Sequence, residues 1–593
     1  MILAAGVLSY WKVADPDVFW HLKAGIVMWE RGRLLSQNTF SSAFPSYPWQ
    51  NNEWLFQLLL AGVYRAGGWA GIAAFKLAAV VALGGLIFGV IMRRAGRPLL
   101  AAAGAVTALA IMQHRLTERP HLLSYLFFAI VVLVLARRER HPKALLALPL
   151  LYALWSNAHP EVIFGLFYLG LVAAGEALDS RGAPSTTGAW FPAGVRRLLL
   201  ATLLCAGATL VNPWGYHLLV LPFGAFGRPD ITITEFGFSS FGLFASFWVL
   251  LAGALALLLA RSRRTWSELL PVLAFGALAV LFQRVIPFFL LVAVPAAFGA
   301  AAEFSGAERS ARRRRVDSAC ALVAYAALVW ALGFERPGLY RWGWGVNEEF
   351  YPAAAADLLA AEPWRGNLYN PYRGGGYLIY RLYPRLGVLQ DGRGGVSYPR
   401  EFMRRMNRDF TPADLPRIMA DYGITVALFN REEVGAHFDR TRWGVVFWDD
   451  AYCVLVRRDS PNRDLLERLE YRFFLPGVDA DRAASPDTLG AFVREMERNQ
   501  AARRSPSAPL ANSIGFLYIR SGDRVAAERL FRGATRIDEA YAPAWANLGI
   551  LLSDSGRTTE AAAALSRALA LDGGLHGARS RLAEIDGRPA GAK

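Results

Sequence analysis

Ionisable side chains gather where the apolar stretches of this sequence end. The first such group is the segment Asp15-Pro16-Asp17-Val18-Phe19-Trp20-His21, which follows an apolar N-terminus. Charged groups at the mouth of a membrane bundle cost free energy, so they usually mark chemistry rather than packing. A carboxylate can deprotonate a hydroxyl group, and nearby cations can stabilise a departing phosphate. These residue types therefore fit the transfer of a sugar from a lipid phosphate.

Further polar residues lie in other loops between apolar runs. They are Gln50, Asn51, Asn52 and Glu53; His114, Arg115, Glu118, Arg119 and His121; Asn157, His159 and Glu161; Asn212 and His217; and Gln283 and Arg284. Some also have a structural explanation: Asp17 as a helix N-cap, and Arg119 or Arg284 as anchors at a membrane surface. Asp15, Asp17 and His21 could hold a divalent cation, but their spacing matches no specific metal site. Metal ligands are therefore not assigned.

The elements that carry these loops are predicted to be membrane-spanning helices. The chain has 593 residues, 54% of them hydrophobic, and a mean hydropathy of +0.26, which is too apolar and too long for one soluble domain. A span needs about 20 residues, and spans are predicted at 69–92, 98–114, 121–137, 143–158, 161–178, 196–212, 241–260, 266–283, 286–304 and 317–334. Residues 1–14 would make an eleventh span. They are short for one and lack signal-peptide features, which indicates a truncated or misassigned start.

The basic residues predict which loops face the cytoplasm. They cluster in every second loop, provided that 53–67 forms an amphipathic interfacial helix instead of a span. The clusters are Arg93, Arg94 and Arg97; Arg137, Arg138, Arg140 and Lys143; Arg196 and Arg197; Arg261, Arg263 and Arg264; and Arg312 to Arg315. The candidate residues then lie on the extracytoplasmic face. The formal charge of +16 follows mostly from this topology and gives no reason to expect a nucleic-acid partner.

A succession of motifs resembles a known group of membrane enzymes. The motifs are DPDVFWHLKAG, WQNNEWLFQLLLAGVYRAGG, RPHLLSYLF, LWSNAHPEVIFGL, NPWGYHLL and RVIPFF, followed downstream by NLYNPYRGGGYLIYRLYPRLGVLQDGR. Together they resemble bacterial integral membrane proteins of the GT-C glycosyltransferase superfamily. The resemblance implies a polytopic transmembrane helical bundle, a polyprenyl-phosphate-linked sugar as donor substrate, and an acidic base in the first extracytoplasmic loop.

The resemblance also implies roles for particular residues. Asp15 or Asp17 becomes the candidate catalytic base, and the candidate donor-phosphate contacts are Arg119, His121 and Arg284. The candidate substrate-binding residues are His21, Glu53 and His159. The sequence departs from the family where Pro160 and Glu161 follow His159 in place of a small, Gly-rich stretch. No cofactor is expected apart from the lipid-linked donor, and a divalent metal stays an open alternative.

Beyond the bundle at 1–334, the pattern predicts soluble extracytoplasmic parts. A small α/β domain is expected at 335–458, with strands at 367–369, 387–390, 425–429, 445–448 and 452–456 and helices at 353–361, 376–382 and 412–422. Within it, Asp391-Gly392-Arg393 is predicted to form a turn with an exposed ion pair. The alternative is that this turn faces the active site and holds acceptor or sugar.

A 34-residue period near the C-terminus predicts tetratricopeptide repeats. Residues 459–508 are expected to be a linker with a helix at 488–503, and the repeats occupy 509–588. The recurring pairs are Gly515 and Gly549, Gly522 and Gly556, Ala527 and Ala561, Ala534 and Ala568, and Asp538 and Asp572. Such repeats usually present a surface to other proteins, so a protein partner is expected.

Three classes of function are compatible with the sequence. The first is a membrane glycosyltransferase of the bacterial inner membrane, which moves a sugar from a polyprenyl-phosphate donor to a glycan, lipid or protein acceptor. The second is a polysaccharide polymerase or ligase, which would not need the acids of the first loop. The third is a non-catalytic assembly factor whose bundle anchors the repeats.

Overall fold

The chain divides into two units in its computed structural model, which describes residues 1–181, 191–225, 238–240, 244–261, 264–304, 311–333, 341–407, 414–433, 439–473 and 488–587. The first unit comprises Met1–Phe40, Phe44–Tyr351 and Asp391–Phe410. The second comprises Ser41–Ala43, Pro352–Gln390 and Thr411–Lys593. Asp391–Phe410 thus group with the first unit, although they lie within the range predicted for the α/β domain.

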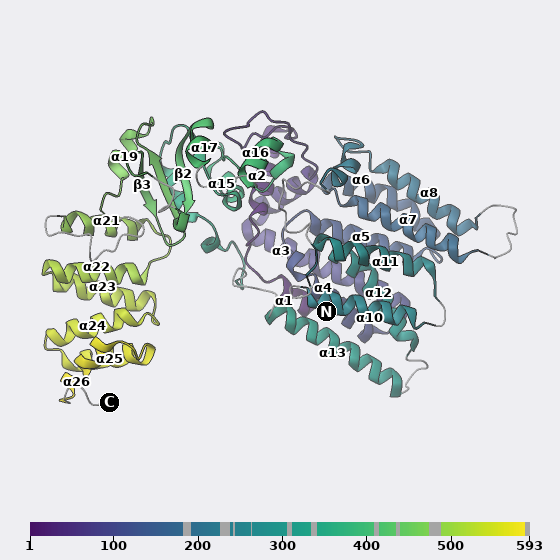
Figure 1. Cartoon of the computed structure of the whole chain (residues 1–593). Coiled ribbons are helices and arrows are strands. Elements are labelled where there is room, and N and C mark those ends of the chain that lie inside the picture. The colour runs from purple at the N-terminus through teal and green to yellow at the C-terminus, as the bar shows by residue number, and fades with distance from the viewer. Residues whose placement is uncertain are drawn as a thin grey trace. The chain divides into compact units, whose positions relative to one another are not determined.

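Helices build the first unit (Figure 1). They are α1 Ile2–Ser9, α2 Asp17–Arg31, α3 Trp54–Ala95, α4 Pro98–Ile111, α5 His121–Arg137, α6 Leu148–Ala158, α7 Val162–Asp179, α8 Ala193–Ala208, α9 His217–Ala225, α10 Ala245–Leu259, α11 Trp266–Leu281, α12 Ile286–Phe304, α13 Ala311–Gly333 and α16 Arg400–Asn407. Short 3-10 helices are η1 Gln113–Arg115, η2 Pro142–Ala147, η4 Gln283–Val285, η5 Glu348–Phe350 and η7 Gly394–Val396. Every apolar run predicted to span contains a helix, which confirms the mostly helical fold.

Some of these helices can cross a membrane by length and composition. Within the described ranges these are Trp54–Ala95, Val162–Asp179 and Gln283–Phe304, and four shorter apolar helices accompany them. The predicted total of about eleven spans therefore stays a prediction.

The core of the first unit surrounds α12, whose residues 286–301 are all buried. A helix that is apolar all round needs neighbours on every face, and α3, α4, α5, α10 and α11 pack against it (Figure 1). Phe288 contacts Tyr125 and Phe128 of α5 and Phe164 of α7, with ring centroids 5.4, 5.1 and 4.7 Å apart. Because such cores are close-packed, this aromatic cluster fixes the helices whose N-terminal ends carry candidate residues.

A glycine interrupts α3 near its start. Gly68 has φ 58° and ψ −146°, which is not helical and is accessible almost exclusively to glycine. Residues 54–67 therefore form a helical segment distinct from the longer apolar part of α3. The prediction of a separate helix at 53–67 is confirmed, and its place in the membrane interface stays a prediction.

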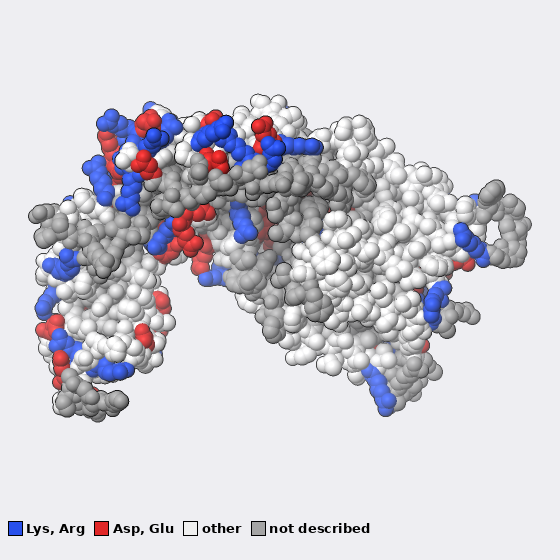
Figure 2. Space-filling view, in the orientation of Figure 1, with Lys and Arg blue, Asp and Glu red and all other residues white. Residues whose placement is uncertain are grey.

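Ion pairs tie together the helix ends that carry the basic clusters. Arg94 at the end of α3 lies 2.7 Å from Glu268 of α11, and Arg261 binds the same carboxylate. Arg97 binds Asp317 of α13 at 2.5 Å. Basic clusters far apart in the sequence thus meet at one end of the helices, as expected of loops on one side of a membrane. Figure 2 shows few charges on the visible face of this unit's helices and blue side chains at their right-hand ends.

A four-stranded sheet organises the first half of the second unit. Its strands β1 Asn367–Tyr369, β2 Ile424–Asn430, β3 Trp443–Trp448 and β4 Tyr452–Arg457 lie in the order β1-β2-β4-β3. Strands β1 and β2 are parallel, and the other pairs are antiparallel. The helices that accompany the sheet are α14 Ala353–Ala361, η6 Tyr372–Gly374, α15 Gly375–Leu382, α17 Leu415–Asp421, α19 Arg463–Leu469 and α21 Leu489–Ala502. Helix α14 packs on β3 and β4, α17 on β2, and α19 on β3.

The strand predicted at 387–390 is wrong. Only Val388 of this stretch makes an isolated bridge, to Ser41. The amide of Asn370 accepts a hydrogen bond from the backbone N–H of Leu389 at 2.9 Å and donates one to the carbonyl of Gln390 at 2.8 Å. A side chain thus satisfies backbone groups that a neighbouring strand would otherwise bind.

Antiparallel helix pairs form the C-terminal part of the second unit. They are α22 Ala508–Ser521, α23 Arg524–Ile537, α24 Ala542–Asp554, α25 Thr558–Leu571 and α26 His576–Ile585. A Cβ atom on Gly515 would lie 2.7 Å from the ring of Phe531, and one on Gly549 would lie 2.6 Å from Leu565. The glycines that recur after 34 residues are therefore the points where paired helices approach closely. Their assignment to the tetratricopeptide class stays a prediction.

Candidate active site

The candidate site begins at the N-terminus of α2. Pro16, with φ −65°, precedes the helix, and the carboxylate of Asp15 accepts a hydrogen bond of 3.0 Å from the backbone N–H of Asp17. Asp17 is the first helical residue and Pro16 occupies the N-cap position, so the interpretation of Asp17 as an N-cap is wrong. Its Oδ1 instead accepts a hydrogen bond from Nε1 of Trp20 at 3.0 Å. Asp15 therefore stabilises the entry of α2, and the carboxylate of Asp17 is held by the side chain of Trp20 one turn further along the helix.

Arg119 brings a cation to both aspartates. Its guanidinium lies 2.9 Å from Oδ2 of Asp17 and 3.6 Å from Oδ2 of Asp15. The loop that carries Arg119 is held by His121, whose Nε2 lies 2.8 Å from the carbonyl of Arg115 and 3.3 Å from Oγ1 of Thr117. His121 thus binds residues of its own loop in this structure, and Arg119 pairs with the carboxylates of Asp15 and Asp17.

A second buried group of acids and histidines lies beside the first. Nδ1 of His21 is 3.9 Å from Oε2 of Glu53, and Oε1 of Glu53 is 3.7 Å from Nε2 of His159. Nδ1 of His159 is 3.1 Å from Glu161, and Nε of Arg284 donates a hydrogen bond of 2.7 Å to Oε1 of Glu161. Acidic and basic side chains therefore alternate from α2 to the end of α11. His21 connects the two groups, since it lies one helical turn after Asp17.

Burial and neighbouring charges shift the pKa values of Glu53 and Glu161 in opposite directions. Burial raises the pKa of Glu53, even though His159 and Arg119 partly oppose this shift. Burial also favours the neutral form of Glu161, but His159 and Arg284 outweigh it and lower the pKa of this carboxyl. Pairs of titratable groups driven apart in this way often separate acid and base roles. Glu53 is the carboxyl that keeps its proton more readily, and Glu161 stays ionised.

His21 is held in its neutral form. Burial lowers its pKa well below the usual value, and the positive charges of Arg119 and Arg393 act in the same direction. The ring stacks on Trp20 with centroids 3.6 Å apart. A neutral imidazole in this place can donate or accept a hydrogen bond, which suits a substrate hydroxyl.

A buried ion pair holds the loop that precedes Arg119. Lys76 of α3 lies 2.5 Å from Oε1 of Glu118 and donates a hydrogen bond of 2.9 Å to the carbonyl of Trp11. Both charged side chains are nearly inaccessible to solvent, so each depends on the other for compensation. The pair therefore joins α3 to the segments before α2 and α5, which carry the aspartates and Arg119.

The turn at Asp391-Gly392-Arg393 also belongs to this part of the first unit, and its predicted exposure is wrong. The side chains of Asp391 and Arg393 are completely buried. A Cβ atom on Gly392 would lie 1.9 Å from Oδ1 of Asp17, so the turn touches the candidate base. The residues near Asp391 predicted an ion pair two residues apart, but nothing in the local sequence indicated that this pair would be buried.

All the predicted site residues thus lie in the first unit, in one of the two polar groups. The first group contains Asp15, Asp17, Arg119 and His121, and the second contains His21, Glu53, His159 and Arg284. Glu161, Thr117 and Trp20 are additional partners that the set of candidate residues omitted. The signal for Glu161 was its place directly after His159-Pro160. Within the described residues, no three His, Cys, Asp or Glu side chains form a group that could hold a metal ion.

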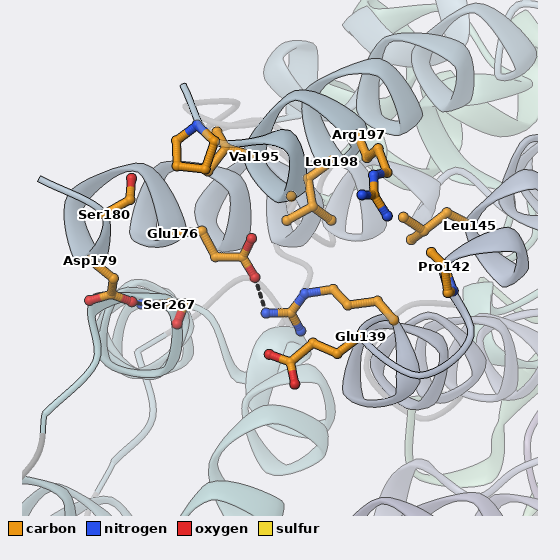
Figure 3. A pocket seen from close by; sticks show the side chains of 13 residues that line it. Glu139, Pro142, Leu145, Glu176, Asp179, Ser180, Val195, Arg197, Leu198 and Ser267 are labelled. Atoms are coloured by element: carbon orange, nitrogen blue, oxygen red, sulfur yellow. Dashed lines mark hydrogen bonds and ion pairs between the residues drawn. The ribbon is translucent and has the colours of Figure 1, made fainter. Parts of the chain in front are cut away.

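A separate cavity lies at the other ends of the same helices. It has a volume of about 540 Å³ and is lined by the C-terminal ends of α5 and α7 and the N-terminal ends of α8 and α11, including Glu176, Arg197 and Ser267. Figure 3 shows the side chain of Glu176 among the residues that line this cavity. Its carboxylate forms an ion pair with Arg138, another lining residue. With 17 residues in α5 and about 1.5 Å rise per residue, this cavity lies roughly 25 Å from the candidate site. It takes no part in the chemistry considered for Asp17.

No protein-family model matches the chain, and no curated protein matches it. Among solved structures, the oligosaccharyltransferase of Archaeoglobus fulgidus in its apo form is similar over 73% of this chain and 69% of its own, with 12% identity and a TM-score of 0.49. ArnT from Cupriavidus metallidurans in its apo state is similar over 77% of this chain and 96% of its own, with 14% identity and a TM-score of 0.47. At these identities the reaction has to be inferred from the side chains themselves.

Proposed function

We propose that the chain is an integral membrane glycosyltransferase that moves a sugar from a polyprenyl-phosphate-linked donor to a glycan, lipid or protein acceptor. The observation that carries this proposal is the contact of 2.9 Å between Asp17 and Arg119. One group can accept the proton of an acceptor hydroxyl, and the other can bind a phosphate. The apolar helices of the first unit suit a substrate with a long lipid tail.

In the proposed reaction, Asp17 is the base. Oδ2 of Asp17 takes the proton of the acceptor hydroxyl while the acceptor oxygen forms a bond to the anomeric carbon of the donor sugar. The bond between that carbon and the phosphate oxygen breaks, and the electron pair leaves with the polyprenyl phosphate. Arg119 exchanges its carboxylate partner for this phosphate and stabilises the negative charge that develops there. Asp15 positions Asp17, because its carboxylate already binds the Asp17 backbone.

The second polar group is proposed to bind sugar hydroxyls and to supply a further cation. Glu53, whose pKa is raised by burial, can donate a hydrogen bond when protonated, and neutral His21 can accept one. Arg284 is engaged by Glu161 and must leave that carboxylate to reach a phosphate. Arg119 and Arg284 therefore both exchange a carboxylate partner for phosphate in this proposal.

The proposed location is the bacterial inner membrane, with the site and the second unit on the extracytoplasmic side. The concentration of basic residues at the opposite helix ends supports this orientation. The helix pairs α22–α26 are proposed to bind a protein partner, as their 34-residue period suggests.

Lipid analysis of cells tests the proposed function. Mass spectrometry of lipid-linked sugars and surface glycans is compared in cells lacking the protein and in cells complemented with wild type, Asp17→Asn or Asp421→Asn. Asp421 is an exposed aspartate of α17 and serves as the control. We expect the lipid-linked donor to accumulate without the protein and with Asp17→Asn, and to disappear with wild type and Asp421→Asn.

Two results would contradict the proposal. Full clearance of the donor by both Asp15→Asn and Asp17→Asn would remove the carboxylate base and favour a polymerase or ligase. Loss of all phenotype on deletion of 506–593, together with silent changes at Asp17 and Arg119, would favour a non-catalytic assembly factor.

A further inference from the structure

A buried turn packs against the carboxylate of the proposed base. The place where a side chain of residue 392 would begin is 1.9 Å from Oδ1 of Asp17 and 3.0 Å from its carboxyl carbon. Gly392 is not among the glycines with positive φ, so its backbone conformation does not itself require glycine. The contact with Asp17 does require it, because any Cβ atom would displace either the carboxylate or the turn.

A fork of charged groups on either side of Gly392 fixes the turn. Nε and Nη2 of Arg393 donate hydrogen bonds of 2.8 and 2.6 Å to the two carboxylate oxygens of Asp391. The hydroxyl of Tyr398 donates a third, at 2.5 Å, to Oδ2 of Asp391. Two charges without solvent access are tolerated only with such bidentate geometry and additional hydrogen bonds. The fork therefore holds the backbone of Gly392 in one position.

Aromatic rings from the loop after α2 enclose the fork. The guanidinium carbon of Arg393 lies 5.0 Å from the ring centroid of Phe40 and 4.8 Å from that of Trp49. Trp49 in turn contacts Trp20, the residue that donates a hydrogen bond to Asp17, with centroids 6.1 Å apart. Arg393 thus lies in a cation–π box formed by Phe40 and Trp49. Through Trp49 and Trp20, this box is connected to the carboxylate of Asp17.

We propose that Asp391 and Arg393 are positioning residues that hold the main chain of Gly392 against Asp17 and so direct its carboxylate toward the acceptor. The inference rests on the proposed function, because it assigns a task to the base of that reaction. Neither Asp391 nor Arg393 touches substrate in this account. They act on the reaction only through the direction of the Asp17 carboxylate, which Trp20 also restrains by its hydrogen bond to Oδ1.

Separate measurements of kcat and of KM for the donor distinguish a positioning role of the turn from a merely structural one. The full-length protein is reconstituted into liposomes, and its rate is measured against increasing amounts of the lipid-linked sugar fraction extracted from cells that lack the protein. We expect Gly392→Ala to lower kcat by about tenfold to a hundredfold, as expected for misplacement of a reacting group by about 1 Å, while KM for the donor stays within about twofold. Gly374→Ala is the matched control, because a Cβ atom there lies 3.8 Å from its nearest neighbour, Pro352.

A milder variant keeps the test valid if Gly392→Ala does not fold. Tyr398→Phe removes one hydrogen bond from Asp391 and preserves the packing of the ring. We expect it to lower kcat by about threefold to tenfold, again with an unchanged KM, and to shift the pH profile of kcat relative to wild type.

The outcomes distinguish this inference from the proposed function. Wild-type kcat and pH profiles in folded Gly392→Ala and Tyr398→Phe, together with an inactive Asp17→Asn, would overturn the positioning role and leave the proposed function intact. An active Asp17→Asn would overturn both. A raised KM with unchanged kcat in Tyr398→Phe would also overturn the inference, because the turn would then bind the donor.

Discussion

Nε of Arg284 donates a hydrogen bond of 2.7 Å to Oε1 of Glu161, so the arginine that the motifs associate with donor phosphate is neutralised by a carboxylate. The two residues stand 123 positions apart in the chain, and the side chain of Glu161 is only 3% exposed. A cation held in this way can bind an incoming phosphate only by exchanging partners. The pair therefore offers a direct test of what Arg284 contributes.

Replacing Arg284 alone should cost more stability than replacing both partners. Arg284→Gln removes one of the two basic partners of the buried Glu161 carboxylate, the other being His159, and we expect a loss on the order of 2–3 kcal/mol, seen as a lower thermal midpoint of the detergent-solubilised protein. The double variant Glu161→Gln/Arg284→Gln should recover most of that loss. Equal midpoints for the single and double variants would contradict the dependence of Glu161 on Arg284.

The raised pKa of Glu53 predicts a stability difference that depends on pH. The folded protein keeps this proton to a higher pH than the unfolded chain. The corresponding stabilisation is complete below the unfolded pKa and is lost as pH rises through the folded pKa. Glu53→Gln imitates the protonated carboxyl, so its midpoint should rise relative to wild type as the pH increases from the ordinary pKa of a glutamate through the raised pKa of the folded protein. A difference that stays constant with pH would show that Glu53 is ionised throughout.

The break in α3 should tolerate only glycine. Gly68→Ala places a side chain at φ 58° and ψ −146°, and we expect a loss of about 1–3 kcal/mol in the free energy of unfolding. Gly67→Ala is the adjacent control: a Cβ atom there meets nothing within 4 Å, and the change should stabilise the helix by up to about 1 kcal/mol. Similar thermal midpoints for the two variants would indicate that the break is not required.

The close helix approach at Gly549 predicts a local effect in the repeats. A Cβ atom at this position lies 2.6 Å from Leu565, so Gly549→Ala should destabilise the α24–α25 pair by about 1–3 kcal/mol. At Gly533 in α23, a Cβ atom meets nothing within 4 Å, so Gly533→Ala should slightly slow the hydrogen exchange of its helix. Hydrogen–deuterium exchange of the full-length protein measures both effects. Unchanged exchange in α24 and α25 of the Gly549→Ala variant would contradict the packing role.

Much of the bundle and of the site could be predicted because loops that alternate along the chain share one end of a helical bundle. This rule predicted that Asp17, Arg119 and Arg284 lie at the same end of the bundle, and the family resemblance then suggested their roles. The 34-residue period likewise identified Gly515 and Gly549 before their neighbours were known. In both cases the signal is local or periodic, which a single sequence can display.

The features that escaped prediction depend on partners far away in the chain. The fork at Asp391 and Arg393 is enclosed by Phe40 and Trp49. The sequence near residue 391 contains no pattern that predicts contact with these distant rings. The false strand at 387–390 fails for the same reason, because the amide of Asn370 takes the place of a neighbouring strand. A hydrogen bond from a distant side chain to the backbone produces no periodic pattern in the sequence.

Asp391–Phe410 belong to the first unit but follow a segment of the second unit in the chain, so during translation they are made late. Asp17 leaves the ribosome early, together with the first apolar helices, but Gly392 and the rings of the cation–π box meet only after the chain has passed through Pro352–Gln390. A nascent chain that already contains every described apolar helix therefore still lacks the buried turn that packs against Asp17. The carboxylate of Asp17 therefore acquires its final surroundings only when translation has moved well beyond the apolar helices.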